Sequence, residues 1–264
     1  LDEAESGLLA LGKPETAAAT QTSKLIALAM LGRYDEAVEC GLRARAVLDA
    51  HGKLLAAGVV EQNIGSIYLR RDRYREAEQF LGQARERFSA LRDEKRLAQI
   101  ENNLALAHTL QHKFRSAEKL YGQALARAQE AGLSVTQAEI EGSMGNLALL
   151  QGRYDRALDY LERSRRRYAT LGMAHQSAIA ELELADAYLE LNLAAEALAV
   201  YERTVPTFAE LGMRAEQARA LAQGGRAALI LGRTEDAHRL LASAPSLYAE
   251  EGNMVGEAFV TLTE

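Results

Sequence analysis

The chain of 264 residues contains no tryptophan, one cysteine (Cys40) and only three prolines (Pro14, Pro206 and Pro245). A single cysteine excludes an internal disulfide framework and is typical of a reducing compartment, so we predict a cytoplasmic protein. Scarce proline, combined with abundant Ala, Leu, Glu, Arg and Gln, favours helix along the whole chain.

The chain also has no excess of basic residues. The formal net charge is −6 and the pI is near 5.6, which argues against a nucleic-acid-binding surface. No apolar run approaches the roughly 18 residues that a membrane-spanning helix needs, and the first residues do not resemble a signal peptide. The sequence therefore predicts partners other than nucleic acids or membranes.

The feature that dominates the sequence is a period of 40 residues. Six segments align without insertion: 31–37, 71–77, 111–117, 151–157, 191–197 and 231–237. A fixed period of this size indicates a solenoid, in which each unit buries its apolar face against its neighbours. We predict a single all-α, right-handed superhelical solenoid over residues 1–264, with repeats at about 14–52, 53–92, 93–132, 133–172, 173–212 and 213–252 and partial repeats at 1–12 and 253–264.

Each repeat contains two helical stretches, which we call helix A and helix B; in the second repeat they are 54–70 and 74–91. The turn between them holds residue types that tolerate a positive φ: Gly32, Asp72, His112, Gly152, Asn192 and Gly232. The turn between repeats holds Gly52, Gly132, Gly172, Gly212 and Gly252. Arg92 departs from this column, and we expect Asp93 to take its role.

Core positions repeat with the same period. Six alanines from Ala37 to Ala237 recur early in helix B, and a second small column in helix A runs from Gly65 to Gly225, with Leu25 as the exception. Two aromatic columns are expected to fill the space beside the turn (Tyr34, Tyr74, Phe114 and Tyr154) and to pack between repeats (Phe88, Tyr168, Phe208 and Tyr248). Small residues facing small residues let antiparallel helices approach closely.

This pattern of small residue, aromatic, turn, aromatic and alanine resembles the tetratricopeptide repeat (TPR), carried in the second repeat by Gly65, Tyr68, Tyr74, Ala77, Leu81 and Ala84. The units are longer than the usual TPR and are most similar to the 40-residue repeats of LGN/Pins polarity adaptors and MalT-like bacterial signalling proteins. Ala194 and Thr234 replace the aromatic beside the turn, and Pro206 and Pro245 fall late in helix B, so we expect the last two repeats to be less regular.

Neither end of the sequence looks like a polar capping repeat. Residues 1–11 are in phase with the end of a helix B, and residues 254–264 are in phase with a helix A. We therefore expect the chain to be part of a longer array. Unpaired apolar residues at the ends, Leu8, Leu9, Phe259 and Val260, would favour self-association.

The resemblance to TPR proteins implies that helix A lines a concave groove. By phase, its inward positions are 59, 62, 66, 69 and 70 in the second repeat and the same columns in the others. Their amides and charges could bind an extended peptide. The candidate partner-binding residues are Gln62, Ser66, Arg70, Gln99, Asn102, Asn103, Leu106, Asn146, Asp186, Glu190, Arg219 and Arg226. The alternative is that these residues only solvate an exposed face.

Three other patterns have a functional and a structural interpretation, and we favour the structural one each time. The column of Glu61, Glu101, Glu141 and Glu181 could attract a basic ligand or pair with neighbouring arginines. The basic run of Arg163, Arg165, Arg166 and Arg167 could bind nucleic acid or form a solvated convex face. His108 and His112 have metal-binding spacing but occupy a packing column and the turn column.

The sequence contains no nucleophile motif, phosphate loop or paired catalytic carboxylates, so we predict neither catalysis nor a cofactor. The leading hypothesis is a scaffold that binds a peptide or helix of a partner protein in its groove. The alternative is a ligand- or protein-sensing region of a larger bacterial signalling protein: a signal-transducing ATPase, a transcription regulator or a CHAT protease. A flanking effector domain would favour the sensor.

Overall fold

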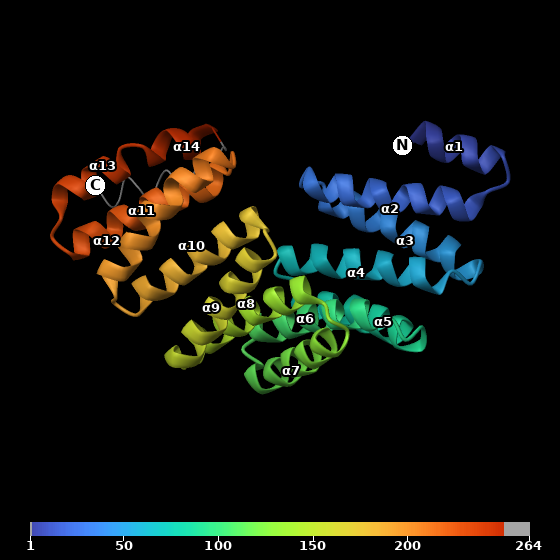
Figure 1. Cartoon of the computed structure of the whole chain (residues 1–264). Coiled ribbons are helices and arrows are strands. Elements are labelled where there is room, and N and C mark those ends of the chain that lie inside the picture. Colours follow the sequence, from blue (N-terminus) through green and yellow to red (C-terminus); the bar gives the residue numbers. More distant parts are fainter. Residues whose placement is uncertain (1, 251–264) are drawn as a thin grey trace. The chain divides into compact units, whose positions relative to one another are not determined.

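The computed structural model describes residues 2–250, and α-helix is the regular structure throughout that range (Figure 1). The A helices are α2 (Pro14–Met30), α4 (Leu54–Arg70), α6 (Glu94–Leu110), α8 (Ser134–Leu150), α10 (Ala174–Glu190) and α12 (Arg214–Ile230). The B helices are α3 (Tyr34–Ala50), α5 (Tyr74–Ala90), α7 (Phe114–Glu130), α9 (Tyr154–Thr170) and α11 (Ala194–Glu210), with α13 (Thr234–Leu241) and α14 (Ala244–Glu250) in the last repeat. α1 (Asp2–Ala10) precedes them. The predicted all-α repeat of antiparallel helix pairs is confirmed; its superhelical sense stays a prediction.

The turns between helices A and B close as the sequence predicts. Asp72, His112 and Asn192 adopt φ values of 57°, 57° and 60°, in the region that glycine occupies at the same column in the other repeats. The amide of the residue that follows each of them donates a hydrogen bond to a carbonyl in the last turn of helix A. The amide of Arg73, for example, donates to the carbonyl of Tyr68 over 2.9 Å. These bonds satisfy carbonyls that the end of helix A leaves free.

Arg92 is the left-handed residue in its turn, with a φ of 53°, so the expectation that Asp93 takes this role is wrong. Asp93 instead caps α6: its carboxylate accepts a hydrogen bond of 3.0 Å from the amide of Arg96. The complete B helices have the same number of residues, so the left-handed residue of the following turn falls at the same column in each repeat, which here is position 92. The aspartate one place later is then free to satisfy an amide at the start of the next helix.

The two late prolines behave differently. α11 continues through Pro206 to Glu210 and is as long as the other complete B helices, so the expectation of an irregular fifth repeat is wrong for its helix lengths. In the sixth repeat, α13 ends at Leu241 and α14 starts at Ala244, directly before Pro245. Proline fits the first turn of a helix, where its missing amide costs no hydrogen bond. Gly252, Phe259 and Val260 lie outside the described residues, as does the side chain of Leu9.

Contacts divide the chain into a first unit, 1–136, and a second unit, 137–264. In both units, the six early alanines of helix B are at most 1% exposed. The late aromatic column is also buried as predicted, whereas the column beside the turn is only partly covered and Tyr154 is 50% exposed. That column therefore shields the turn from outside rather than filling the core.

The small column of helix A packs against the residue sixteen positions later. A Cβ placed on Gly65 would lie 2.6 Å from Cγ of Leu81, and one on Gly225 would lie 2.5 Å from Cγ of Leu241. Leu25 is not a defect in this scheme, because its Cδ1 would lie 2.5 Å from a Cβ on Gly41. In the first repeat the large and the small residue have exchanged helices, which conserves the packed volume.

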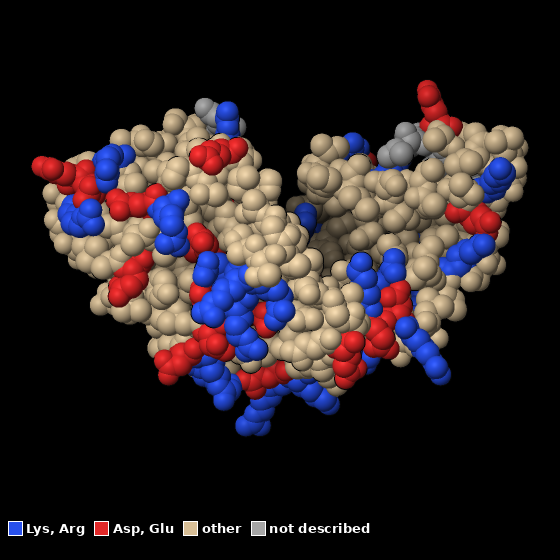
Figure 2. All heavy atoms as spheres, in the orientation of Figure 1, with Lys and Arg blue, Asp and Glu red and all other residues tan. Residues whose placement is uncertain are grey.

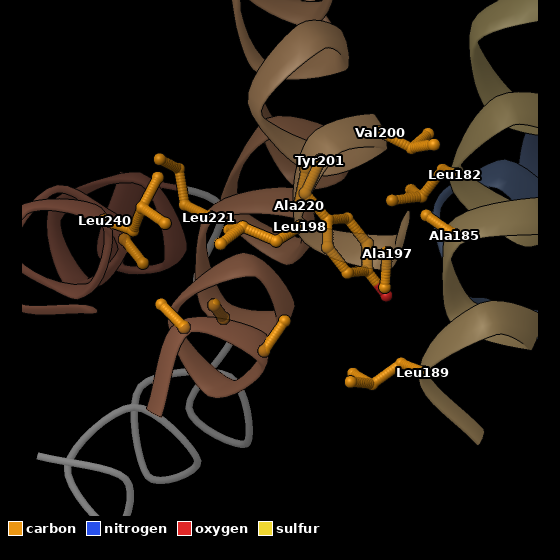
Figure 3. Close-up of a cluster of buried hydrophobic side chains, with 14 of the residues drawn as sticks. Leu182, Ala185, Leu189, Ala197, Leu198, Val200, Tyr201, Ala220, Leu221 and Leu240 are labelled. Carbon is orange, nitrogen blue, oxygen red and sulfur yellow. The ribbon is translucent and has the colours of Figure 1, made fainter. Parts of the chain in front are cut away.

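The core of the second unit shows how this packing supports a polar group (Figure 3). Leu182, Ala185 and Leu189 of α10 lie across from residues of α11. Tyr201 of α11 is fully buried there, and its hydroxyl donates a hydrogen bond of 2.6 Å to Asp186. The core thus holds one carboxylate of α10 in a fixed position.

Candidate partner-binding surface

All the predicted partner-binding residues lie on A helices. In the first unit, α4 carries Gln62, Ser66 and Arg70, and α6 carries Gln99, Asn102, Asn103 and Leu106. In the second unit, α8 carries Asn146, α10 carries Asp186 and Glu190, and α12 carries Arg219 and Arg226. Whether these residues bind a partner stays a prediction.

The second unit gathers its predicted residues around one pocket. Asn146, Asp186, Glu190, Arg219 and Arg226 all line a cavity of about 330 Å³ between α8, α10 and α12. Leu149, Ala187 and Leu189 add apolar surface to its wall. The periodicity of the sequence therefore identified residues from three successive A helices that the fold brings together.

Asp186 is the fixed point of this pocket. Its carboxylate accepts hydrogen bonds from the hydroxyl of Tyr201 and from the guanidinium of Arg219. Burial raises the pKa of Asp186, opposed by Arg219 and by the Tyr201 hydroxyl. Burial likewise raises the pKa of Tyr201, so its hydroxyl stays a donor at neutral pH. The network holds Arg219 against the wall, and among residues 2–250 no carboxylate lies within ion-pair distance of the exposed Arg226.

Sequence reasoning missed two residues of this pocket, Glu183 and Gln223. Both stand in the column of Asn103, so following that column through the later repeats would have found them. Glu183 is half-buried, and its pKa is raised chiefly by burial. The Oε1 atom of Gln223 is buried and accepts no hydrogen bond from the part of the chain that the structure describes. The pocket therefore contains two acceptors that the fold does not satisfy.

A second cavity, of about 270 Å³, adjoins the first, since Asn146 and Glu183 line both. Glu139, Tyr168 and Ile179 contribute to its walls. Much of Glu139 is exposed, yet surrounding protein atoms desolvate its carboxyl and raise its pKa. Glu139 belongs to the inward column of Gln99 and Arg219 but is not among the predicted residues.

The first unit offers a different pocket. A cavity of about 620 Å³ is lined by Leu54, Leu55, Val59 and Leu91 together with small and polar residues of α2. Leu54 and Leu55 are 44% and 45% exposed. None of the predicted residues of α4 and α6 lines this cavity, although Val59 occupies a predicted inward column.

Two of the predicted residues in the first unit have local features of their own. Ser66 donates a hydrogen bond to the Gln62 carbonyl within α4, over 3.0 Å. The Oδ1 atom of Asn102 is buried and accepts no hydrogen bond. Asn102 therefore retains an unused acceptor, whereas the Ser66 hydroxyl already has an acceptor.

All four members of the glutamate column lie within 4.0 Å of an arginine, which confirms the predicted pairing, and three of them are internal. Glu61, Glu101 and Glu141 are at most 1% exposed. Each is bonded by the arginine 26 residues later, with distances of 2.8 Å from Arg87 to Glu61, 3.0 Å from Arg127 to Glu101 and 3.0 Å from Arg167 to Glu141. We call these pairs the arginine clamps. They are structural and leave no acidic stripe for a ligand at these three positions.

The basic run of α9 is also paired. Arg163 and Arg167 contact Glu141, whereas Arg165 and Arg166 bond to Glu162. These two arginines lower the pKa of Glu162 to about 2. On the face drawn in Figure 2, a group of basic side chains lies near the middle of the view, and acidic side chains lie along its edges.

The two histidines occupy the predicted places. His108 Nε2 lies 2.6 Å from a carboxylate oxygen of Glu78, and burial lowers the pKa of His108. His112 occupies the turn, and its ring meets Phe114 edge-on. Among residues 2–250, no three His, Cys, Asp or Glu side chains are grouped to hold a metal ion. Nor does any helix in this range have the length and apolarity to cross a bilayer.

The sequence model of the tetratricopeptide repeat family matches this chain in four overlapping segments, 16–90, 54–130, 96–170 and 136–210. The chain belongs to the tetratricopeptide repeat family. A search of curated proteins finds no match to this TPR chain.

Solved structures with a similar fold include BtubC from P. vanneervenii, with a TM-score of 0.69 and 18% identity over 84% of this chain and 90% of that one. A Rap protein complexed with Competence and Sporulation Factor has a TM-score of 0.69 and 14% identity, over 91% of this chain and 72% of that one. A STAND protein with a tetratricopeptide repeat sensor from Pyrococcus horikoshii has a TM-score of 0.70 and 15% identity. The TPR chain covers 96% of its own length in that comparison but only 42% of the STAND protein. At these identities the likeness concerns the fold.

Proposed function

We propose that this TPR chain is a protein-interaction scaffold that binds a peptide or helix of a partner protein on its A helices. The observation that carries the proposal is the pocket of the second unit, where five predicted residues from α8, α10 and α12 meet. No single helix could assemble that set, so the site depends on stacking three repeats. Family membership and the neighbour complexed with Competence and Sporulation Factor are consistent with this role.

The chemistry of the pocket suits a polypeptide. The exposed amide of Asn146 can donate to a carbonyl and accept from an amide of an extended main chain. Leu149 and Leu189 offer apolar surface beside it. In the first unit, the half-buried amides of Gln99 and Asn103 and the exposed Leu106 present the same combination on α6.

Selection from a random peptide library would test the scaffold. Peptides chosen on the wild-type chain would be titrated against Asn103→Ala, Asn146→Ala and Arg226→Ala, and against two matched controls on B helices, Arg115→Ala and Arg156→Ala. Both control arginines are exposed. We expect a loss of about five- to tenfold in affinity for at least one A-helix variant, because truncating a buried contact costs about 1 kcal/mol or more, and no loss for the controls.

The same titration can reject the proposal. If the A-helix variants bind as tightly as the wild type while Arg115→Ala or Arg156→Ala abolishes binding, the A helices are the wrong surface. Failure to select any peptide from libraries of extended and helical design would also contradict a general scaffold role.

A second candidate function is a sensor region of a larger signalling protein. The observation that favours it is the fold similarity to the STAND protein, whose name assigns a sensor role to its tetratricopeptide repeats. A gene that encodes an ATPase, a helix-turn-helix domain or a CHAT domain beside this segment would support the sensor. Effector activity that is unchanged by saturating the A-helix surface with peptide would contradict it.

A further inference from the structure

The two adjoining cavities of the second unit, which we call the joined cavities because Asn146 and Glu183 line both, contain acceptors that have no donor among residues 2–250. Glu183 lies where the two cavities meet, and a Cβ on Gly142 would be 3.7 Å from its Oε2 atom. No hydrogen bond or ion pair within 4.0 Å joins Glu183 to a basic side chain of residues 2–250. On the next A helix, the Oε1 atom of Gln223, in the same column, is buried and without a donor. Two unsatisfied acceptors from successive helices thus face the same space.

Acidic side chains also outnumber basic ones around these cavities. Glu139, Glu183, Asp186 and Glu190 line the joined cavities, against two arginines. Arg219 is already committed to Asp186. Because a desolvated carboxylate without a partner is costly, the site gains most from a ligand that brings positive charge and several donors at once.

The shape of the second cavity agrees with such a ligand. Its wall includes the buried Tyr168, whose ring can contact a planar cation, and the aliphatic side chain of Ile179. An arginine or lysine side chain has an apolar stem and a charged, donor-rich head, so it matches an apolar wall that ends in acceptors. In the first unit, the same columns hold the neutral residues Val59, Gln99, Asn63 and Asn103.

We propose that the joined cavities of α8, α10 and α12 bind a basic side chain, arginine above all, of the partner polypeptide. Glu183 is the counter-ion and Gln223 Oε1 accepts a further hydrogen bond from the same group. This assignment rests on the proposed scaffold function and adds the chemical class that its second unit selects.

The probe that tests this pocket is Nα-acetyl-L-arginine N-methylamide, titrated into the ¹⁵N-labelled chain and followed by amide chemical shifts. The matched control ligand is the citrulline analogue, which has nearly the same shape and no charge. We expect saturable shifts of the Gln223 side-chain amide and of α10 and α12 backbone amides with the arginine compound, at concentrations on the order of millimolar. The citrulline compound should bind about tenfold more weakly.

Variants of the chain provide the second arm. Glu183→Gln should weaken the arginine compound by about tenfold, since it removes the charge but keeps the shape. Glu196→Gln, an exposed glutamate of α11, should leave the affinity unchanged. Equal binding of the arginine and citrulline compounds, or equal binding by Glu183→Gln and wild type, would overturn the assignment. Binding of free L-arginine but not of the blocked compound would also overturn it, because the site would then recognise an amino acid and not a side chain.

The scaffold and the pocket can fail separately. Library-selected peptides that bind the A helices but tolerate replacement of every arginine and lysine by neutral residues would leave the scaffold standing and reject the cation pocket. Saturable arginine binding at Gln223 in a chain that selects no peptide would reject the scaffold and retain the pocket chemistry.

Discussion

In the first unit, the A helices surround a large cavity with leucine and valine walls, whereas in the second unit they enclose smaller cavities lined by carboxylates, amides and guanidinium groups. The early alanines and the late column of helix B are buried in both units, although the late column holds Leu48, Phe88 and Ala128 in the first unit and Tyr168, Phe208 and Tyr248 in the second. Leu54, Leu55 and Leu91 supply the leucine wall in the first unit, whereas columns 59, 63 and 66 of the repeat supply most of the polar wall in the second. Binding chemistry in this chain can therefore vary while the packing that stacks the helices stays constant.

The arginine clamps show a second difference. In the first unit, Glu61 and Glu101 are each held by an arginine 26 residues later, and Arg85 adds a bond of 2.8 Å to Glu101. In the second unit, Thr207 stands where the clamp arginine of Glu181 would be. Glu181 is left with Arg165 at 3.5 Å and Arg203 at 3.4 Å, and its side chain is 20% exposed. The first unit thus has two clamps, at Glu61 and Glu101, whereas its first repeat holds Gln21 and Val47 at the clamp positions; the second unit has one clamp, at Glu141.

Removing a clamp should have the largest effect. Arg87→Met would leave Glu61, which is 1% exposed, without its closest partner and should destabilise the chain by about 3 kcal/mol. The second unit has no arginine at the clamp position of Glu181, so the comparison variant is Arg203→Met, which removes the shorter of the two contacts of Glu181, made by an exposed arginine, and should cost less than about 1 kcal/mol. Denaturant unfolding of both variants provides the comparison, and equal losses would show that the two units are not clamped differently.

Overpacking the shared core should affect both units alike. Gly65→Ala and Gly225→Ala place a methyl group within 2.6 Å and 2.5 Å of a buried leucine, so each should cost about 1–3 kcal/mol in a thermal or denaturant melt. Gly122→Ala is the control, since no atom lies within 4 Å of its added Cβ and helix propensity should stabilise it by about 0.5–1 kcal/mol. A large cost in one unit alone would contradict a common packing scheme.

The smallest effect concerns the unsatisfied carboxylate of the second unit. Burial raises the folded-state pKa of Glu183 above its ordinary value of 4.5, so the folded chain binds the proton more tightly than the unfolded chain. Stability from this group is therefore greatest below pH 4.5 and falls as the pH rises through the raised folded pKa. Glu183→Gln should stabilise the chain at pH 7 by up to about 1 kcal/mol. Melts at pH 7 and pH 4 would check this, and a Gln variant that is less stable at pH 7 would contradict it.

Periodicity was sufficient to predict the helices and most turns, because one residue count repeats in every unit. Reasoning from residue preference failed at Arg92, where the repeat count imposes a left-handed arginine that such a preference disfavours. It also failed at Pro206, which α11 accommodates. Leu25 looked like an exception until the structure placed Gly41 against it. Each failure involves a residue whose fit depends on a neighbour or on chain length and not on its own propensity.

The candidate surface was predictable to the same extent. Phase alone identified Asn146, Asp186, Glu190, Arg219 and Arg226, because phase determines which face of a helix a residue occupies. Phase does not determine how deeply a side chain on that face is buried. The desolvation of Glu183 and the unsatisfied acceptor of Gln223 depend on what the adjacent helices place opposite them, which a single sequence does not reveal.

Amide hydrogen–deuterium exchange of the chain with and without a library-selected peptide tests the central claim, that the A helices of the second unit bind the partner. If these helices bind the partner, bound peptide should slow exchange in α8, α10 and α12, with little change in α9 and α11. Glu183→Gln should reduce this protection for an arginine-containing peptide. Protection confined to α9 and α11, with exchange in α8, α10 and α12 unchanged, would contradict the account.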